Sequence, residues 1–149
     1  YNEILLNIRA GIINSKLGNY DDALSFFEEA LERCLAQSYE HEQKKAYYQL
    51  GILYLQWGKY DLSETFLLKA QALEEEAKAS FTGYETHRVL AELFEAQGDF
   101  KKALYHERRY STIKDIFLED LEQKIPTRKI LAEEKVEYFL FNLQLNFLH

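Results

Sequence analysis

A repeat with a period of 40 residues constrains the fold of this chain more than any other feature of its sequence. Its markers are three glycines, Gly18, Gly58 and Gly98, each followed by one polar residue and then by an aromatic residue. Three positions after each aromatic residue stands a small one. A glycine that follows a helical stretch supplies the left-handed residue that ends a helix. The repeating unit is therefore expected to be a helix, a tight turn and a second helix.

Helical periodicity predicts where these helices lie. In the second unit, for example, Leu50, Tyr54 and Trp57 recur every three or four residues before the turn. A seventh helix is expected to begin after Pro126 and to run to about residue 147. The other six form three hairpins, and their expected ranges are 2–17, 20–37, 40–57, 60–79, 82–97 and 100–119.

Composition narrows the class of protein. Apolar residues make up 47% of the chain and aromatic residues 15%, which argues against disorder. One Pro and six Gly leave few turns for an all-β fold, and one Cys excludes a disulfide framework. The net charge of -7 disfavours non-specific nucleic-acid binding. No apolar run reaches the roughly 18 residues of a membrane-spanning helix. An all-α domain is what remains.

The N-terminal sequence bears on cellular context. The chain begins at Tyr1 and contains no Met, so we expect flanking sequence that is not included here. The first residues have no basic region and no cleavage site of a signal peptide. A single unpaired Cys favours a reducing compartment. A cytoplasmic location is therefore expected.

The repeat resembles the tetratricopeptide repeat family. That family's pattern is an aromatic residue, Leu-Gly and Tyr on the first helix, and small residues around an aromatic one on the second. The family period is about 34 residues, so 40 implies longer helices. The resemblance implies a right-handed α-solenoid with hairpins at 1–39, 40–79 and 80–119, followed by a capping or connector helix at 120–149. The second unit matches best, at Tyr47, Leu50, Gly51, Tyr54, Gly58, Tyr60, Ser63, Leu67 and Ala70.

The resemblance also implies a concave groove, lined by the first helix of each unit, that binds an extended or helical peptide. A clamp for a C-terminal carboxylate is excluded, because its positions hold Ile8, Ile12 and Val89. Coverage by a neighbouring helix would explain the apolar candidates equally well, and solvated surface is the alternative for the two cationic ones. The candidate groove residues are Ile8, Ile12, Lys45, Tyr48, Ile52, Leu55, Arg88 and Glu92.

No catalytic constellation is visible in the sequence. It contains no Gly-rich phosphate loop, no nucleophile elbow and no HExxH motif. The histidines at 41, 87, 106 and 149 have no metal-ligand spacing. Cys34 has apolar neighbours and is expected to be a buried, inert thiol. We therefore expect no metal, no cofactor and no enzymatic activity in this segment.

The last predicted helix is unusually apolar, on more than one face. We expect part of it to cap the third unit and part to contact another chain, as in a homodimer, or a further domain. Four of its residues follow the 4-3-4 spacing of a short coiled-coil seam: Val136, Leu140, Leu143 and Phe147.

The third unit resembles the last repeat before the output domain of bacterial signalling proteins, either diguanylate cyclases or histidine kinases. This implies a sensory or scaffolding region that binds a protein or peptide, with any enzymatic activity in an output domain outside the segment. The alternatives are a peptide-pheromone-sensing regulator and a stand-alone adaptor. The resemblance rests on Lys101, Lys102, Ala103, Tyr110, Lys114, Asp115, Ile116 and Phe117.

Overall fold

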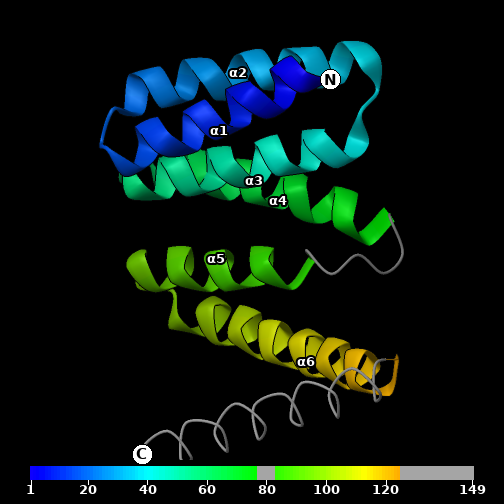
Figure 1. Cartoon of the computed structure of the whole chain (residues 1–149). Helices are drawn as coiled ribbons and strands as arrows, with labels where there is room; N and C mark the ends of the chain where they lie inside the picture. Colours follow the sequence, from blue (N-terminus) through cyan, green and yellow to red (C-terminus); the bar gives the residue numbers. More distant parts are fainter. Residues whose placement is uncertain (77–82, 125–149) are drawn as a thin grey trace, which may run out of the picture. The chain divides into compact units, whose positions relative to one another are not determined.

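The computed structural model describes residues 1–76 and 83–124 (Figure 1). Every described element is a helix, which confirms the all-α fold. None of the described helices combines the length and the apolar character that crossing a bilayer requires. The helices are α1 (Asn2–Lys16), α2 (Tyr20–Gln37), α3 (Glu40–Gln56), α4 (Tyr60–Glu76), α5 (Gly83–Ala96) and α6 (Phe100–Lys124).

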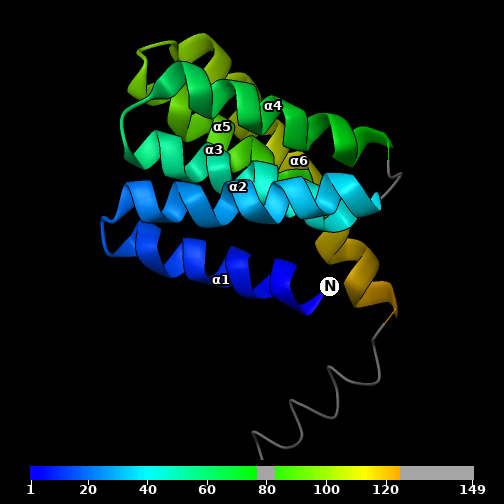
Figure 2. The ribbon, with the colours of Figure 1, turned by 90° about the horizontal axis from the view of Figure 1, so that it is seen from above.

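The chain divides into two compact units, Tyr1–Ser111 and Thr112–His149. The division falls inside α6, so the first unit holds five whole helices and the beginning of the sixth. In the first unit, the hairpins α1–α2 and α3–α4 stack as successive layers, and α5 follows them (Figures 1 and 2). Of the second unit, only the C-terminal part of α6 is described.

The three marker glycines end the first helix of each hairpin. Their φ angles are 80°, 75° and 78° at Gly18, Gly58 and Gly98, in the left-handed region that the sequence predicts. After Gly58, the backbone N–H of Lys59 donates to the carbonyl of Tyr54 at 2.8 Å, and the same bond recurs after Gly18 and Gly98. This bond is the six-to-one contact of a Schellman turn. The turns therefore have one geometry in all three units.

Close helix packing inside each hairpin depends on a small residue of the first helix. A Cβ atom added to Gly11 would lie 2.4 Å from the ring of Phe27, and one added to Gly51 would lie 2.5 Å from Leu67. The third unit has Ala91 at the equivalent position, 6% exposed. The main core cluster then spans α2 and α3 and consists of Ala23, Phe27, Leu50, Leu53 and Tyr54.

The end of α6 differs from the sequence prediction, and other predicted segments lie beyond the described residues. Helix α6 runs to Lys124 rather than to residue 119, because no Pro or Gly interrupts it before Pro126. Residues 77–79 of the predicted fourth helix and the whole helix expected after Pro126 fall outside the described residues. The capping residues Val136, Leu140, Leu143 and Phe147 belong to that helix, so their role stays a prediction.

Candidate functional site

A cavity of about 290 Å³ opens on the face formed by the first helices of the hairpins. Its volume is near the lower end of the range for ligand pockets, roughly 300–1,000 Å³. Helix α1 supplies two of its residues, α3 supplies four, and α4 and α5 supply one each. The lining residues are Ile8, Ile12, Lys44, Lys45, Tyr48, Gln49, Glu74 and Glu85.

The apolar part of the cavity comes from α1 and α3. Ile8 is 6% exposed and belongs to a core cluster with Ile4 and Cys34, so only the edge of its side chain faces the cavity. Ile12, one turn later, packs against the same cluster. Tyr48 of α3 also lines the cavity and packs against the core cluster that contains Leu67 of α4 and Val89 of α5. Cys34 is fully buried, as the sequence predicts, and burial raises the pKa of its thiol.

The charged part of the cavity contains two lysines, Lys44 and Lys45, that differ in burial and in their charged neighbours. Lys44 is only 5% exposed, and burial lowers the pKa of its amine while the charge of Glu74 acts in the opposite direction. Glu74 also accepts a hydrogen bond of 2.8 Å from the hydroxyl of Thr86. Lys45 is partly exposed and forms no ion pair with any residue that the structure describes. Lys45 is therefore available to a bound anion.

Arg88 and Glu92, two of the predicted groove residues, lie on α5 outside the lining of the cavity. The guanidinium of Arg88 is bonded to Glu85 at 2.9 Å through Nε and to Glu92 through Nη1. These carboxylates, with the Glu85 bond as the largest contribution, raise the pKa of Arg88. The charge of Arg88 is thus already matched by two carboxylates of the same helix.

The structure brings together four of the eight predicted groove residues, Ile8, Ile12, Lys45 and Tyr48, around one cavity. Ile52 and Leu55 instead pack against the core cluster that contains Leu67 and Val89. The sequence therefore anticipated part of the lining, and the binding role of all eight residues stays a prediction.

Sequence reasoning missed four lining residues, Lys44, Gln49, Glu74 and Glu85. Lys44 and Tyr48 are separated by one helical turn, so helical periodicity alone contained the signal for Lys44. Its charge concealed it, because lysine is rarely buried. Glu74 and Glu85 lie on either side of residues 77–82, and only the fold brings them to the cavity.

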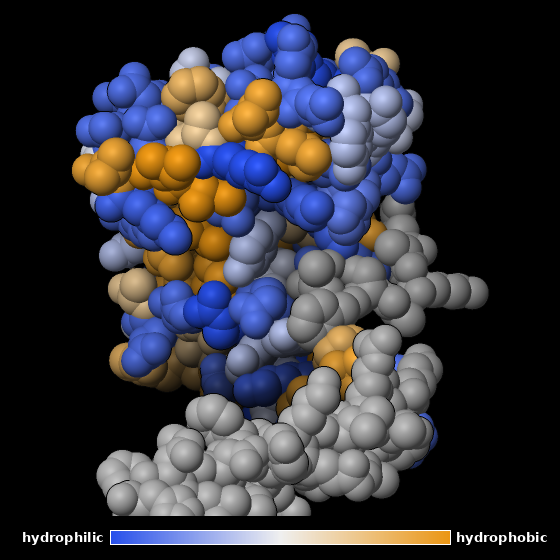
Figure 3. Space-filling view, viewed as in Figure 1, coloured by the Kyte–Doolittle hydropathy of each residue, from blue (hydrophilic) through white to orange (hydrophobic). Residues whose placement is uncertain are grey.

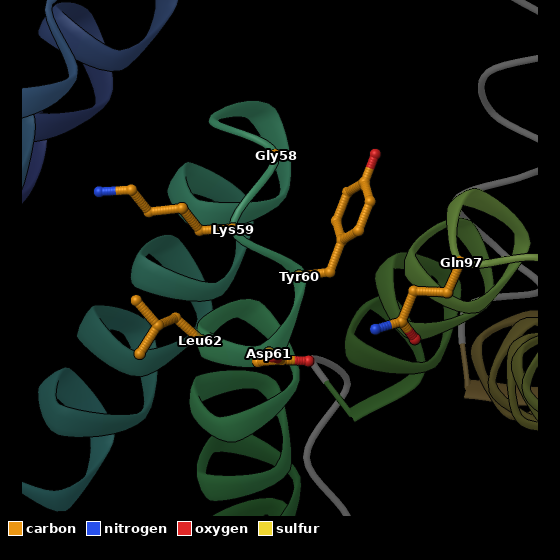
Figure 4. Close-up of a pocket in the computed structure, with 6 residues that line it drawn as sticks. All are labelled: Gly58, Lys59, Tyr60, Asp61, Leu62 and Gln97. Carbon is orange, nitrogen blue, oxygen red and sulfur yellow. The ribbon is translucent and has the colours of Figure 1, made fainter.

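A second depression, of about 390 Å³, lies where the turn between α3 and α4 approaches the end of α5. In Figure 4, Tyr60 extends between the turn and Gln97, whereas Lys59 and Leu62 project to the other side. Lys59 lies over the ring of Trp57, 3.4 Å from its centroid. These side chains diverge, so we assign the α3–α4 depression no binding role.

The third hairpin contains a buried pair of histidines that the sequence reasoning also missed. Nδ1 of His87 lies 2.8 Å from Nδ1 of His106, and Phe94 stacks on the ring of His106 at 5.4 Å. Burial lowers the pKa of His106, and the charge of Lys102 acts in the same direction. His87 stands 11 residues before Gly98 and His106 stands 8 residues after it, and the antiparallel hairpin brings the two rings together.

The described histidines, Cys34 and carboxylates also bear on metal binding. Among the described residues, no group of three or more His, Cys, Asp or Glu side chains is placed to hold a metal ion. The first-helix face combines apolar side chains, the partly exposed amine of Lys45, and carboxylates that are already engaged with neighbours.

The sequence model of one protein family, described as the tetratricopeptide repeat, matches residues 2–76, half of the chain. A search among curated protein sequences found no significant match. Among solved structures, the chain is similar to the TPR domain of Arabidopsis FLU, with 21% identity and a TM-score of 0.72 over 77% of this chain and 97% of that one.

A second similar structure is BtubC (BKLC) from P. vanneervenii, with 21% identity and a TM-score of 0.70. That match covers 76% of this chain and 47% of BtubC. At this level of identity, both likenesses establish the fold alone.

Proposed function

The chain belongs to the tetratricopeptide repeat family, and on that premise we propose that it binds a partner protein or peptide at the cavity between α1 and α3. Tetratricopeptide repeats are protein-interaction modules, and stacked hairpins present a continuous face to a ligand. The observation that carries the proposal is the cavity itself, with Ile8, Ile12 and Tyr48 on its floor and walls.

The size of the cavity suits one anchoring side chain rather than a whole ligand. Apolar or aromatic anchors that fill a desolvated pocket dominate the energy of most interfaces. The remaining polar groups of the lining, such as Gln49, would then orient the backbone of the bound segment.

Lys45 adds a preference of charge to this site. Lys44 has Glu74 beside it, and Arg88 is held by Glu85 and Glu92, whereas Lys45 has no ion pair among the described residues. The favoured ligand is therefore a segment with an acidic residue next to an apolar one. The contribution of one exposed ion pair is about 0.2–1 kcal/mol, so the anchor provides most of the affinity.

A peptide array tests the proposal. The array would carry segments that combine a Leu, Phe or Tyr anchor with Asp, Gln or Lys at neighbouring positions. The labelled chain should favour an anchor flanked by Asp, and Lys45→Gln should remove the preference for Asp over Gln. The matched control is Lys101→Gln, on the exposed side of α6. A preference that survives Lys45→Gln contradicts the site.

For the whole protein, we propose a sensory or scaffolding role in a bacterial signalling protein. Its support is the resemblance of the third unit to the last repeat before an output domain, together with the unbroken course of α6 from Phe100 to Lys124. A helix of this length suits a connector to a following domain. The coding sequence after His149 tests this role, because a cyclase or kinase domain there supports it and an adaptor without any output domain contradicts it.

A further inference from the structure

Helix α1 carries an exposed apolar stripe on the side that faces away from α2. Leu6 is 62% exposed, Ile13 59% and Leu17 69%, and Ala10 continues the stripe between them. The spacing of four, three and four residues keeps the stripe on one side of the helix. In the space-filling view, apolar side chains gather over the part of the molecule where α1 lies (Figure 3). Three large, mostly exposed apolar residues on one helix indicate an interaction surface.

The equivalent residues of the other two units show how such a surface is buried in this repeat. A shift of 40 residues moves Leu6, Ala10 and Ile13 onto Ala46, Leu50 and Leu53 of α3, which are between 0% and 1% exposed. A second shift moves them onto Thr86, Leu90 and Leu93 of α5, all 0% exposed. The same side of the first helix is therefore buried in both later units and open only in the first.

The element that buries this side is the second helix of the preceding hairpin. On α3, Leu50 and Leu53 belong to one core cluster with Ala23 and Phe27 of α2. On α5, Leu90 and Leu93 belong to the corresponding cluster with Leu67 of α4. The same kind of interface, between the second helix of one hairpin and the first helix of the next, is thus formed twice.

Charge at the edge of the stripe is consistent with the same kind of cover. Arg9 and Lys16 occupy the places that Gln49 and Gln56 have on α3, and neither forms an ion pair with any described residue. On α3, Gln56 accepts a hydrogen bond from Ser15 of α1, and Gln49 lines the cavity with Ile8 of α1. Arg9 and Lys16 would therefore lie beside the first helix of a preceding hairpin.

We propose that the stripe on α1 is covered by the second helix of one further hairpin of this repeat, which precedes Tyr1 in the same polypeptide. The array then has at least four hairpins, and the stripe is an internal packing surface of the full protein. This proposal does not depend on the cavity between α1 and α3, which lies on a different side of α1.

The test compares residues 1–149 with a longer protein that restores the preceding unit of about 40 residues from the gene. Ile13→Glu is introduced into both. In the shorter protein the side chain is exposed, so the melting temperature should change by no more than roughly 2 °C. In the longer protein it is buried, and the melting temperature should fall by roughly 5–10 °C.

The matched control is Leu68→Glu. Leu68 is 45% exposed on α4, and its equivalents, Glu28 and Arg108, are exposed charged residues, so this substitution should have the same small effect in both proteins. A labelling experiment needs no change in stability: Leu6→Cys should react with a maleimide in the shorter protein and be protected in the longer one, because its equivalents Ala46 and Thr86 are 0% exposed. Cys34, fully buried, contributes little background.

Three results would overturn the proposal. One is an equal effect of Ile13→Glu in the two proteins. Another is a gene without a helical hairpin before Tyr1. The third is a dimer of residues 1–149 that Ile13→Glu dissociates in sedimentation experiments, because a second copy would then be the occupant of the stripe.

Discussion

The first-helix face of this protein has two parts that differ in whether their charged side chains already have ion-pair partners. Between α1 and α3, apolar residues line a cavity and Lys45 has no ion pair among the described residues. On α5, Arg88 is bonded to both Glu85 and Glu92, so its charge is already matched. The difference indicates that a charged side chain is informative about binding only where no neighbour already matches its charge.

The two parts also rest on different interiors. In the α1–α3 part, Ile8 and Ile12 pack in an apolar cluster with Ile4, Ala30 and Cys34. The α5 part is supported by the polar pair of His87 and His106 as well as by Phe94.

The largest effect should come from separating α3 from α4 beneath the cavity. A Cβ at Gly51 would lie 2.5 Å from Leu67, so Gly51→Val forces the two helices apart and should lower the free energy of unfolding by about 3 kcal/mol. Urea denaturation followed by circular dichroism measures this. The control is Ala72→Val on the exposed side of α4, expected to change stability by about 0.5 kcal/mol at most. Equal effects of the two would refute the close packing.

Filling the cavity should remove binding without unfolding the chain. Gln49 is partly exposed and lines the cavity, so Gln49→Trp should occupy the anchor site and weaken a peptide selected on the array by about tenfold or more. Fluorescence anisotropy measures the affinity. The same substitution at Gln97, beside the α3–α4 depression, is the control and should leave the affinity unchanged. Loss of binding in the Gln97 variant would move the site to that depression.

Acidification should weaken the histidine-supported part. Burial lowers the pKa of His106 in the folded state below its ordinary value of 6.5, so the unfolded chain binds a proton more readily. This contribution to stability is present above about pH 6.5 and is lost as the pH falls below that value. Thermal unfolding at both pH values measures it. His106→Leu should reduce the difference, whereas the exposed His41→Leu should not.

The smallest effect is expected from removing single charges, and it distinguishes Lys45 at the cavity from Arg88 on α5. Lys45→Gln should lower the affinity for an acidic peptide by roughly threefold and reduce the salt dependence of binding, as expected for a single exposed ion pair. Arg88→Gln should change the affinity less, because Glu85 and Glu92 already use that charge. Titrations at low and high salt compare them. A larger loss with Arg88→Gln would show that the ligand replaces the internal ion pairs.

The fold was largely predictable because its signals are local. Glycines at the turns fix φ, and apolar spacing fixes the buried side of each helix, so the helices through Ala96 match the expected ranges where they are described. The turn at Ser38, with a φ of 54°, gave no such signal, because serine is not the usual residue for the left-handed region.

The site was only partly predictable because its remaining members depend on packing between units. Lys44 is buried beside Glu74 from the next helix, and His87 meets His106 across a turn. Ile52 and Leu55 follow the same periodicity as Tyr48, yet α5 packs against them. Periodicity identifies the side of a helix, but it does not reveal how far the neighbouring helix extends along it.

The most direct test of the proposed binding site is a map of chemical-shift changes in the ¹⁵N-labelled chain on titration with the strongest peptide from the array. We expect the largest changes at Ile8, Ile12, Lys45, Tyr48 and Gln49, the residues from α1 and α3 that surround the cavity. Changes centred on Tyr60 and Gln97, or along α5 at Arg88 and Glu92 with none at Ile12, would contradict the assignment of binding to the cavity.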